Sequence, residues 1–131
     1  MNAKTIILID DDDIFVYLTS KVIADAQGLE LMKVFGNGLD ALHYLKAHLA
    51  SPGDLPEIIL LDLSMPIMDG WQFLESYLPL LPKFGKKITL YIVSSSITPA
   101  DISRARAIEA VCDYIIKPIT RDKLTQMAAS L

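Results

Sequence analysis

The sequence predicts an α/β protein in which a doubly wound, five-stranded parallel sheet carries helices on both faces. Three observations lead to this fold class. Five short apolar, β-branched runs alternate with five helical segments along the chain. The apolar excess of the whole chain suits a sheet that is covered on both faces, although residues 29–35 alternate in part. The 131 residues fit one domain with a real core, and 52% hydrophobic against 21% charged residues exclude a disordered chain.

The first strand is expected over residues 5–9, a continuous apolar run. Asp13 can then cap a helix that runs to about Ala26, and Gly28 ends it. The apolar stripe expected on this helix comprises Ile14, Leu18, Val22 and Ile23. Residues 29–35 form the second expected strand.

A Gly-Asn-Gly turn at residues 36–38 leads into a second amphipathic helix, expected from Leu39 to about Leu49. Its apolar face comprises Leu42, Leu45 and Leu49. Residues 51–56 are rich in proline and glycine and are expected to form a loop.

The third strand, residues 57–61, is the most apolar of the five. A loop over residues 63–69 follows, and Gly70 opens the third helix. Pro79 and Pro82 should kink that helix or end it early, because proline lacks the amide hydrogen that a helix interior needs.

The fourth strand is expected over residues 88–93. Thr98 then caps a helix that starts at Pro99, the position in a helix where proline is favoured. Residues 111–116 form a short fifth strand, and Thr120 caps a last helix that ends near the C-terminus.

Polar side chains stand at the carboxyl ends of four expected strands: Asp10 and Asp11, Asp62, Ser94 and Lys117. In a doubly wound sheet these ends meet at one edge, which is where ligands bind. Clustered carboxylates are unfavourable unless a cation lies among them, and a lysine beside them suits a phosphate or another anion. The edge of the sheet is therefore the expected functional site.

These residue types fit phosphoryl transfer. Asp62 ends the most buried strand and is the best candidate for a nucleophile that forms an aspartyl phosphate. Asp10 and Asp11 would hold Mg²⁺, which prefers oxygen ligands. Lys117 would pair with phosphoryl oxygens as a point charge, and Ser94 could donate a hydrogen bond to them. The chain has no glycine-rich phosphate loop, so a nucleotide site is not expected.

At these positions the chain resembles the receiver domains of two-component response regulators. The resemblance rests on LIDDD at 8–12, LDLSMPIMDG at 61–70, IVSS at 92–95 and YIIKP at 114–118. It extends from about residue 4 to residue 131. The long stretch around Asp62 is highly specific, whereas the paired aspartates and the Lys-Pro pair gain weight from their order and spacing.

The resemblance implies a flavodoxin-like fold with strand order 2-1-3-4-5. It implies that Asp62 takes a phosphoryl group from a phosphohistidine on a sensor histidine kinase or a phosphotransfer protein. It also implies a Mg²⁺ site made by Asp11, by Asp10 mostly through water, by Asp62 and by the backbone carbonyl of Ser64.

Further roles follow from the same resemblance. Ser94 would move toward the phosphoryl group, Tyr114 would change its rotamer with it, and Lys117 would contact the phosphate. The Lys117–Pro118 bond is expected to be cis. Ser94 stands where threonine is more usual and Ser95 where a smaller residue is common. Ser64 and Ser96 occupy positions that tune the phosphoryl lifetime in the family, which leaves that lifetime open.

The resemblance implies a single receiver domain over residues 1–131 with no output domain. It is expected to be a switch and not an enzyme, although it catalyses its own phosphorylation and dephosphorylation. Its output would be contact with a downstream protein or onward phosphotransfer, and a homodimer on phosphorylation is possible.

The composition bears on location and partners. A net charge of −4 argues against non-specific binding of nucleic acid or of an anionic membrane. The first apolar run is too short for a signal peptide or a membrane span. The single cysteine, Cys112, excludes an internal disulfide, fits the cytoplasm and is expected to be a buried thiol.

Three other functions remain open from the residues. A small-molecule phosphatase could also use an aspartate nucleophile. The dehalogenase-like signature, however, has a second aspartate two residues after the nucleophile, where this chain has Ser64. A flavodoxin-like cofactor binder would not place four aspartates where the phosphate loop belongs. The third is a receiver that serves only as a constitutive scaffold.

Overall fold

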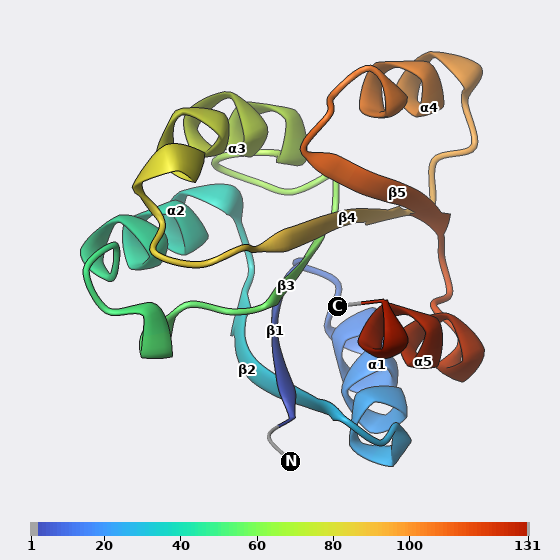
Figure 1. Cartoon of the computed structure of the whole chain (residues 1–131). Coiled ribbons are helices and arrows are strands. Elements are labelled where there is room, and N and C mark those ends of the chain that lie inside the picture. Colours follow the sequence, from blue (N-terminus) through green and yellow to red (C-terminus); the bar gives the residue numbers. More distant parts are fainter. Residues whose placement is uncertain (1–2, 131) are drawn as a thin grey trace.

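One parallel sheet lies between two layers of helices in the computed structural model, which describes residues 3–130 (Figure 1). The strand order is β2-β1-β3-β4-β5, as the resemblance implies, and all four pairings are parallel. The strands are β1 (Lys4–Ile9), β2 (Leu29–Phe35), β3 (Ile58–Leu61), β4 (Thr89–Ser94) and β5 (Val111–Ile116). The doubly wound fold is thereby confirmed.

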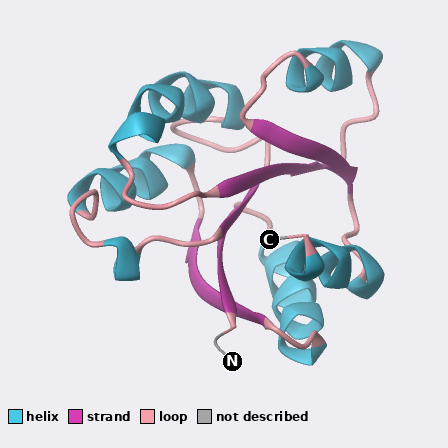
Figure 2. Cartoon of the chain, in the orientation of Figure 1, coloured by secondary structure: helices cyan, strands magenta, loops and turns pink. Residues whose placement is uncertain are grey.

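Helices cover both faces of the sheet (Figures 1 and 2). One face carries α1 (Asp13–Asp25) and α5 (Arg121–Ala129), and the other carries α2 (Gly38–Ala47), α3 (Gly70–Tyr77) and α4 (Pro99–Arg106). Two short 3₁₀ helices, η1 (Pro52–Asp54) and η2 (Leu78–Lys83), join the layers. No helix within residues 3–130 is long and apolar enough to cross a lipid bilayer.

The central strands are buried on both sides, which explains why their sequences do not alternate. In β3, Ile59 and Leu61 pack toward α2 and α3, whereas Ile58 and Leu60 pack toward α1 and α5. All four side chains are fully buried. Full burial of one such side chain contributes about 1.5–3 kcal/mol, so β3 provides a rigid base for the residue that follows it, Asp62.

The face that α1 buries differs from the expected one. The helix is capped by Asp12 and not by Asp13, because the Asp12 carboxylate accepts hydrogen bonds from the first free amides of the helix. The buried residues are Phe15, Thr19 and Ile23. The side chains of Ile14 and Leu18 are 72% and 54% exposed, so the stripe predicted from them was wrong for these two residues.

Most other boundaries lie within two residues of expectation. Helix α3 ends at Tyr77 and continues as η2, which carries Pro79 near its start and Pro82 inside, as the two prolines predicted. Gly28 has a φ of +84° just after α1, the left-handed conformation that glycine adopts without strain. Leu49 lies beyond the end of α2 but packs against the same core.

Cys112 is exposed, so the prediction of a buried thiol was wrong. It lies near the start of β5, the last strand of the sheet, where the side chains of Val111 and Asp113 are also only partly covered. As an edge strand, β5 has a neighbouring strand on one side only. Its buried side chains are Tyr114 and Ile115, in the second half of the strand.

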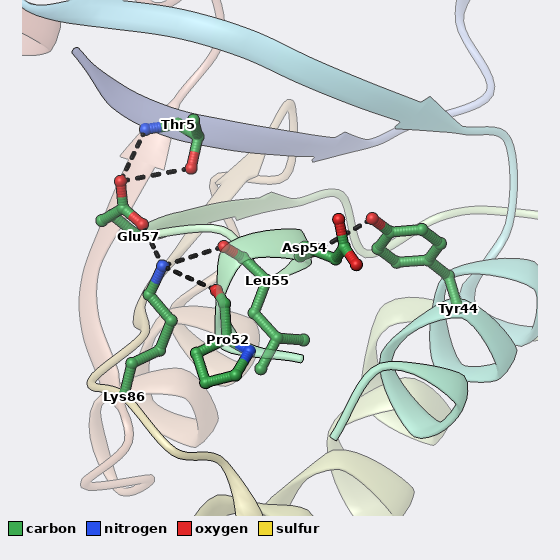
Figure 3. A network of polar contacts seen from close by, with 7 residues as sticks. All are labelled: Thr5, Tyr44, Pro52, Asp54, Leu55, Glu57 and Lys86. Carbon is green, nitrogen blue, oxygen red and sulfur yellow. Dashed lines mark hydrogen bonds and ion pairs between the residues drawn. The ribbon is translucent and has the colours of Figure 1, made fainter. Parts of the chain in front are cut away.

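A polar network closes the edge of the sheet opposite the carboxyl ends (Figure 3). The Lys86 ammonium donates hydrogen bonds to the carbonyls of Pro52 and Leu55, at 3.2 and 3.0 Å, and forms an ion pair with Glu57. The Glu57 carboxylate also accepts from the amide and the hydroxyl of Thr5, at 3.1 and 3.2 Å. The network therefore joins η1 to the beginnings of β1 and β3.

Candidate functional site

Three of the candidate residues are placed by backbone hydrogen bonds to a neighbouring strand. The amide of Asp10 donates to Phe35 at the end of β2, and the amide of Asp62 donates to Ile9 at the end of β1, both at 2.9 Å. The amide of Lys117 donates to the carbonyl of Ser94 at the same distance. These bonds extend the sheet by one residue beyond the strands. The backbone of each of these three residues is therefore held in place by the sheet.

Three carboxylates converge at this edge. Asp10, Asp11 and Asp62 each offer an oxygen, and these oxygens lie within 4.8 Å of one another. Asp10 and Asp62 are buried, and Asp11 is exposed. The register of β1 on β3 brings them together, because Ile9 pairs with Leu61 and the next residue of each strand is an aspartate.

The Lys117 ammonium lies among these carboxylates. Its Nζ is 2.8 Å from Oδ2 of Asp10 and 3.6 Å from Oδ1 of Asp62. The Lys117–Pro118 bond is cis, as the resemblance implies. The predicted convergence of three carboxylates and one ammonium is therefore present in the fold.

Burial shapes the acidity of the site. Burial and the nearby Asp10 carboxylate raise the pKa of Asp62 to about 6, although the Lys117 ammonium acts in the opposite direction. Burial likewise raises the pKa of Asp10 above its ordinary value, against hydrogen bonds from Lys117 and from the amide of Asp12. Holding both carboxylates ionised is unfavourable unless more positive charge is present.

The donor set fits a hard divalent cation. Three carboxylate oxygens close enough to share one ion are the ligands that Mg²⁺ prefers. The exposed position of Asp11 leaves one side of the cluster open to water, which Mg²⁺ retains in protein sites. The residues present therefore fit the cation that the sequence predicted.

The loop between β3 and α3 is tightly built around two special positions. The amide of Met68 donates to the carbonyl of Pro66 at 2.7 Å across Ile67, whose φ is +68°, forming a γ-turn with a positive central φ. At Gly70, a Cβ atom would lie 2.4 Å from the carbonyl oxygen of Asp62. Glycine is required there because α3 starts directly against the end of β3.

Ser64, whose carbonyl is a predicted Mg²⁺ ligand, lies exposed in the same loop. Asp69 forms a capping box with Gln72 and so opens α3. This contact gives Asp69 a local structural role that accounts for its place in the sequence.

The predicted switch residues are connected through Ser96. The hydroxyl of Ser94, which is buried, accepts a hydrogen bond from the amide of Ser96 at 3.1 Å. The hydroxyl of Tyr114 donates to the carbonyl of Ser96 at 2.8 Å. The Ser96 hydroxyl in turn donates to Asp101 of α4 at 2.6 Å. One loop residue therefore contacts Ser94, Tyr114 and α4.

A cavity of about 330 Å³ is lined by residues that follow Asp62 and by residues at the end of β4 and after it. Its lining includes Ser64, from the loop after β3, and Ser94, the last residue of β4. Trp71 of α3 lines it as well, and the Arg104 guanidinium of α4 lies 4.2 Å from the centre of the Trp71 ring. The cavity gives a small ligand space next to the site.

Comparison with known proteins identifies the family. The sequence pattern of the response regulator receiver domain matches residues 6–129. The chain belongs to this family. The match extends over nearly the whole chain, so the resemblance inferred from the four short stretches is confirmed.

Relatives agree with this membership. The receiver domain is 30% identical over 125 residues to the chemotaxis protein CheY of Treponema pallidum, covering 95% of this chain and 81% of that protein. It spans only 30% and 51% of the length of two other curated relatives. Those longer proteins are a methylesterase/glutaminase of Chromobacterium violaceum and a C4-dicarboxylate response regulator of Priestia megaterium.

Solved structures show the same fold. A two component response regulator from Cytophaga hutchinsonii aligns with a TM-score of 0.86 at 30% identity, covering 99% of this receiver domain and 97% of that chain. The CheX-CheY-BeF3-Mg+2 complex from Borrelia burgdorferi aligns at 0.78 and 21% identity, covering 98% and 89%.

The contacts of two residues in this receiver domain, Ser96 and Phe15, were not foreseen from its sequence. The resemblance placed Ser96 at a position that tunes the phosphoryl lifetime, but it did not foresee the links of Ser96 to Ser94 and Tyr114, which arise from the path of the loop after β4. Phe15 was not among the expected site residues, yet its ring lies under the Lys117 ammonium at 4.2 Å. The only signal in the sequence is its place three residues after Asp12, the residue that caps α1.

Proposed function

We propose that this receiver domain is a phosphorylation-dependent switch in which Asp62 accepts the phosphoryl group. The observation that carries the proposal is the position of Asp62. It is buried at the end of the central strand, with two carboxylates and the Lys117 ammonium beside it. Asp62 thus stands where a cation and an ammonium can both reach a group attached to it.

The donor would be a phosphohistidine on a sensor histidine kinase or a phosphotransfer protein. A carboxylate oxygen of Asp62 attacks phosphorus, the new O–P bond forms as the N–P bond breaks, and the imidazole leaves with the electron pair and takes up a proton. Mg²⁺ bound by Asp10, Asp11, Asp62 and the carbonyl of Ser64 would neutralise the charge on the phosphoryl oxygens.

The chain's own residues would then change partners. Lys117 would leave Oδ2 of Asp10, where it lies at 2.8 Å, and pair with a phosphoryl oxygen. Ser94 would give up the amide of Ser96 and donate to the same group. Because Ser96 also accepts from Tyr114, this exchange would reach Tyr114 and α4 and remodel their surface.

The wider role rests on the family. We infer that the chain acts as a single receiver domain over residues 1–131 in the cytoplasm, and that it catalyses its own phosphorylation and dephosphorylation. Its output would be contact with a downstream protein, or passage of the phosphoryl group onward. A homodimer formed on phosphorylation is a further possible output.

The test is intact-mass analysis after incubation with Mg²⁺ and a small phosphodonor such as phosphoramidate. Wild type should gain one phosphoryl group, and Asp62→Ala and the Mg²⁺-free sample should gain none. Asp69→Ala is the control, because it removes a carboxylate of the same loop that caps α3 and leaves the cluster intact.

An adduct that persists in Asp62→Ala would refute the assignment of the acceptor. A wild type that shows no adduct and binds no beryllofluoride would favour the constitutive scaffold. Equal binding of a protein partner with and without phosphorylation would argue against the switch.

A further inference from the structure

Within residues 3–130, two carboxylates and one aromatic ring lie close to the Lys117 ammonium, which has little access to water. Its side chain is 15% exposed. One neighbour is the Asp10 carboxylate at 2.8 Å, a second is Asp62 at 3.6 Å, and the third is the face of the Phe15 ring, whose centroid lies 4.2 Å away. An ammonium over an aromatic face within about 6 Å is attracted by the electron density of the ring. Phe15 thus occupies a side of the cation that water would otherwise solvate.

Phe15 is held in register with the site by its backbone. The amide of Phe15 donates to the Asp12 carboxylate at 3.2 Å, and the amide of Asp12 donates to Oδ1 of Asp10 at 2.9 Å. Since Oδ2 of Asp10 contacts Lys117, the four residues form a closed circuit of contacts. The start of α1 is thereby tied to the carboxylate cluster, and the ring is fixed under the ammonium.

We propose that Phe15 is a positioning residue for Lys117, and that it retains the ammonium in the site while Lys117 exchanges Asp10 for an anion on Asp62. That an anion becomes attached to Asp62 rests on the proposed function. The contact between Phe15 and Lys117 is observed in the structure.

A ring suits this task better than another carboxylate would. A hydrogen bond to a carboxylate has a preferred direction and would hold Lys117 in one place. The attraction of a ring face is spread over the ring, so the ammonium can shift toward Asp62 and keep its contact with Phe15. A further carboxylate would also raise the negative charge that a phosphoryl group must meet.

The first test replaces Phe15 with phenylalanine carrying one, two or three ring fluorines, which withdraw electron density and change the shape little. The readout is the affinity for beryllofluoride with saturating Mg²⁺, followed by the fluorescence of Trp71, the single tryptophan, which lines the adjacent cavity. Affinity should fall stepwise, by about tenfold from the unmodified ring to the trifluorinated ring.

The matched control is the same series at Phe73. That ring is also buried, but it stacks on Tyr77 and not under a cation. Its fluorination should leave the beryllofluoride affinity within about twofold, since it changes no cation–π contact. A flat series at Phe15, or an equal fall at Phe73, would overturn the proposal.

A second measurement needs neither phosphoryl group nor metal. In the ligand-free protein, ¹⁵N relaxation of the Lys117 ammonium should report a restricted group in wild type and in Phe15→Tyr, which keeps an aromatic face. It should report a mobile group in Phe15→Leu. Unchanged mobility in Phe15→Leu would overturn the positioning role. If wild type binds no beryllofluoride, the proposed function fails, and this measurement still decides the role of Phe15.

Discussion

At the scale of single residues, two positions in the loop after β3 carry unusual constraints. Ile67 adopts a φ of +68° although it is β-branched, and its side chain is 75% exposed. A left-handed conformation costs such a residue about 1–2 kcal/mol. Gly70 lies so close to the carbonyl of Asp62 that it has no room for a side chain.

Ile67→Asn should stabilise the protein by about 0.5–1 kcal/mol, because asparagine tolerates the left-handed region far better. Urea unfolding measures the change. Ile97→Asn is the control, since Ile97 is 71% exposed in the next loop and does not have a positive φ. Equal gains in both variants would show that loss of exposed apolar surface, and not relief of strain, is responsible.

Gly70→Ala should destabilise the protein by about 2–3 kcal/mol, since a methyl group must push α3 away from the end of β3. The displacement would also disturb Asp62 and slow its modification by a small phosphodonor. Gly36→Ala provides the comparison, because no atom lies within 4 Å of its Cβ position. A stable Gly70→Ala variant would mean that α3 has freedom to shift.

At the scale of elements, the polar contacts of Lys86 and Glu57 join η1 to the beginnings of β1 and β3, at the edge of the sheet opposite the site. Although burial opposes it, the hydrogen bonds from Lys86 and from Thr5 lower the pKa of Glu57 below its ordinary value. Lys86 also satisfies two carbonyls near η1. Its removal leaves a partly buried carboxylate and two acceptors without a donor.

Lys86→Met should therefore cost about 1–3 kcal/mol at pH 7. Because folding depresses the pKa of Glu57, this stabilisation is present above its ordinary value of 4.5 and is lost as the pH falls below it. Urea unfolding at pH 7 and pH 3.5 should show the gap between wild type and Lys86→Met narrowing in acid. An equal difference in unfolding free energy at both pH values would contradict this prediction. Lys87→Met is the control: Lys87 is exposed, so its replacement should change the unfolding free energy little at either pH.

At the scale of the whole molecule, the carboxylate cluster links the stability of the fold to pH and to cations. The raised pKa of Asp62 means that its favourable contribution is fully present below the ordinary value of 3.8 and is lost as the pH rises through about 6. A cation that binds only the folded protein restores stability by RT ln(1 + [L]/Kd), about 2.7 kcal/mol at 100 times Kd.

With a chelator present, this contribution should make wild type lose more stability between pH 5 and pH 7.5 than Asp62→Asn, which has no carboxyl to ionise. Adding Mg²⁺ should raise the Tm of wild type at pH 7.5 and should do so much less at pH 5. Asp11→Asn should lose most of the Mg²⁺ effect. A Tm that does not change when Mg²⁺ is added, at either pH, would refute a cation site at this edge.

Part of this protein could be predicted from its sequence because the signals are local. Apolar runs set the strands, caps and prolines set the helix ends, and parallel topology brings strand ends together. Those rules by themselves place Asp10, Asp11, Asp62, Ser94 and Lys117 at one edge of the sheet. The strand order came from the resemblance to the family.

The tertiary structure decided which faces and loops meet. Capping by Asp12 instead of Asp13 fixed where α1 begins, and packing on the sheet turned Phe15 inward and left Ile14 exposed. Successive helix residues point about 100° apart, so a difference of one position changes the buried face. Phe15 and Lys117 come from opposite ends of the chain, and their contact exists only because β1 and β5 bring their carboxyl ends to one edge. Local patterns therefore determined the elements and the chemistry of the site, whereas contacts between distant segments determined how that chemistry is held.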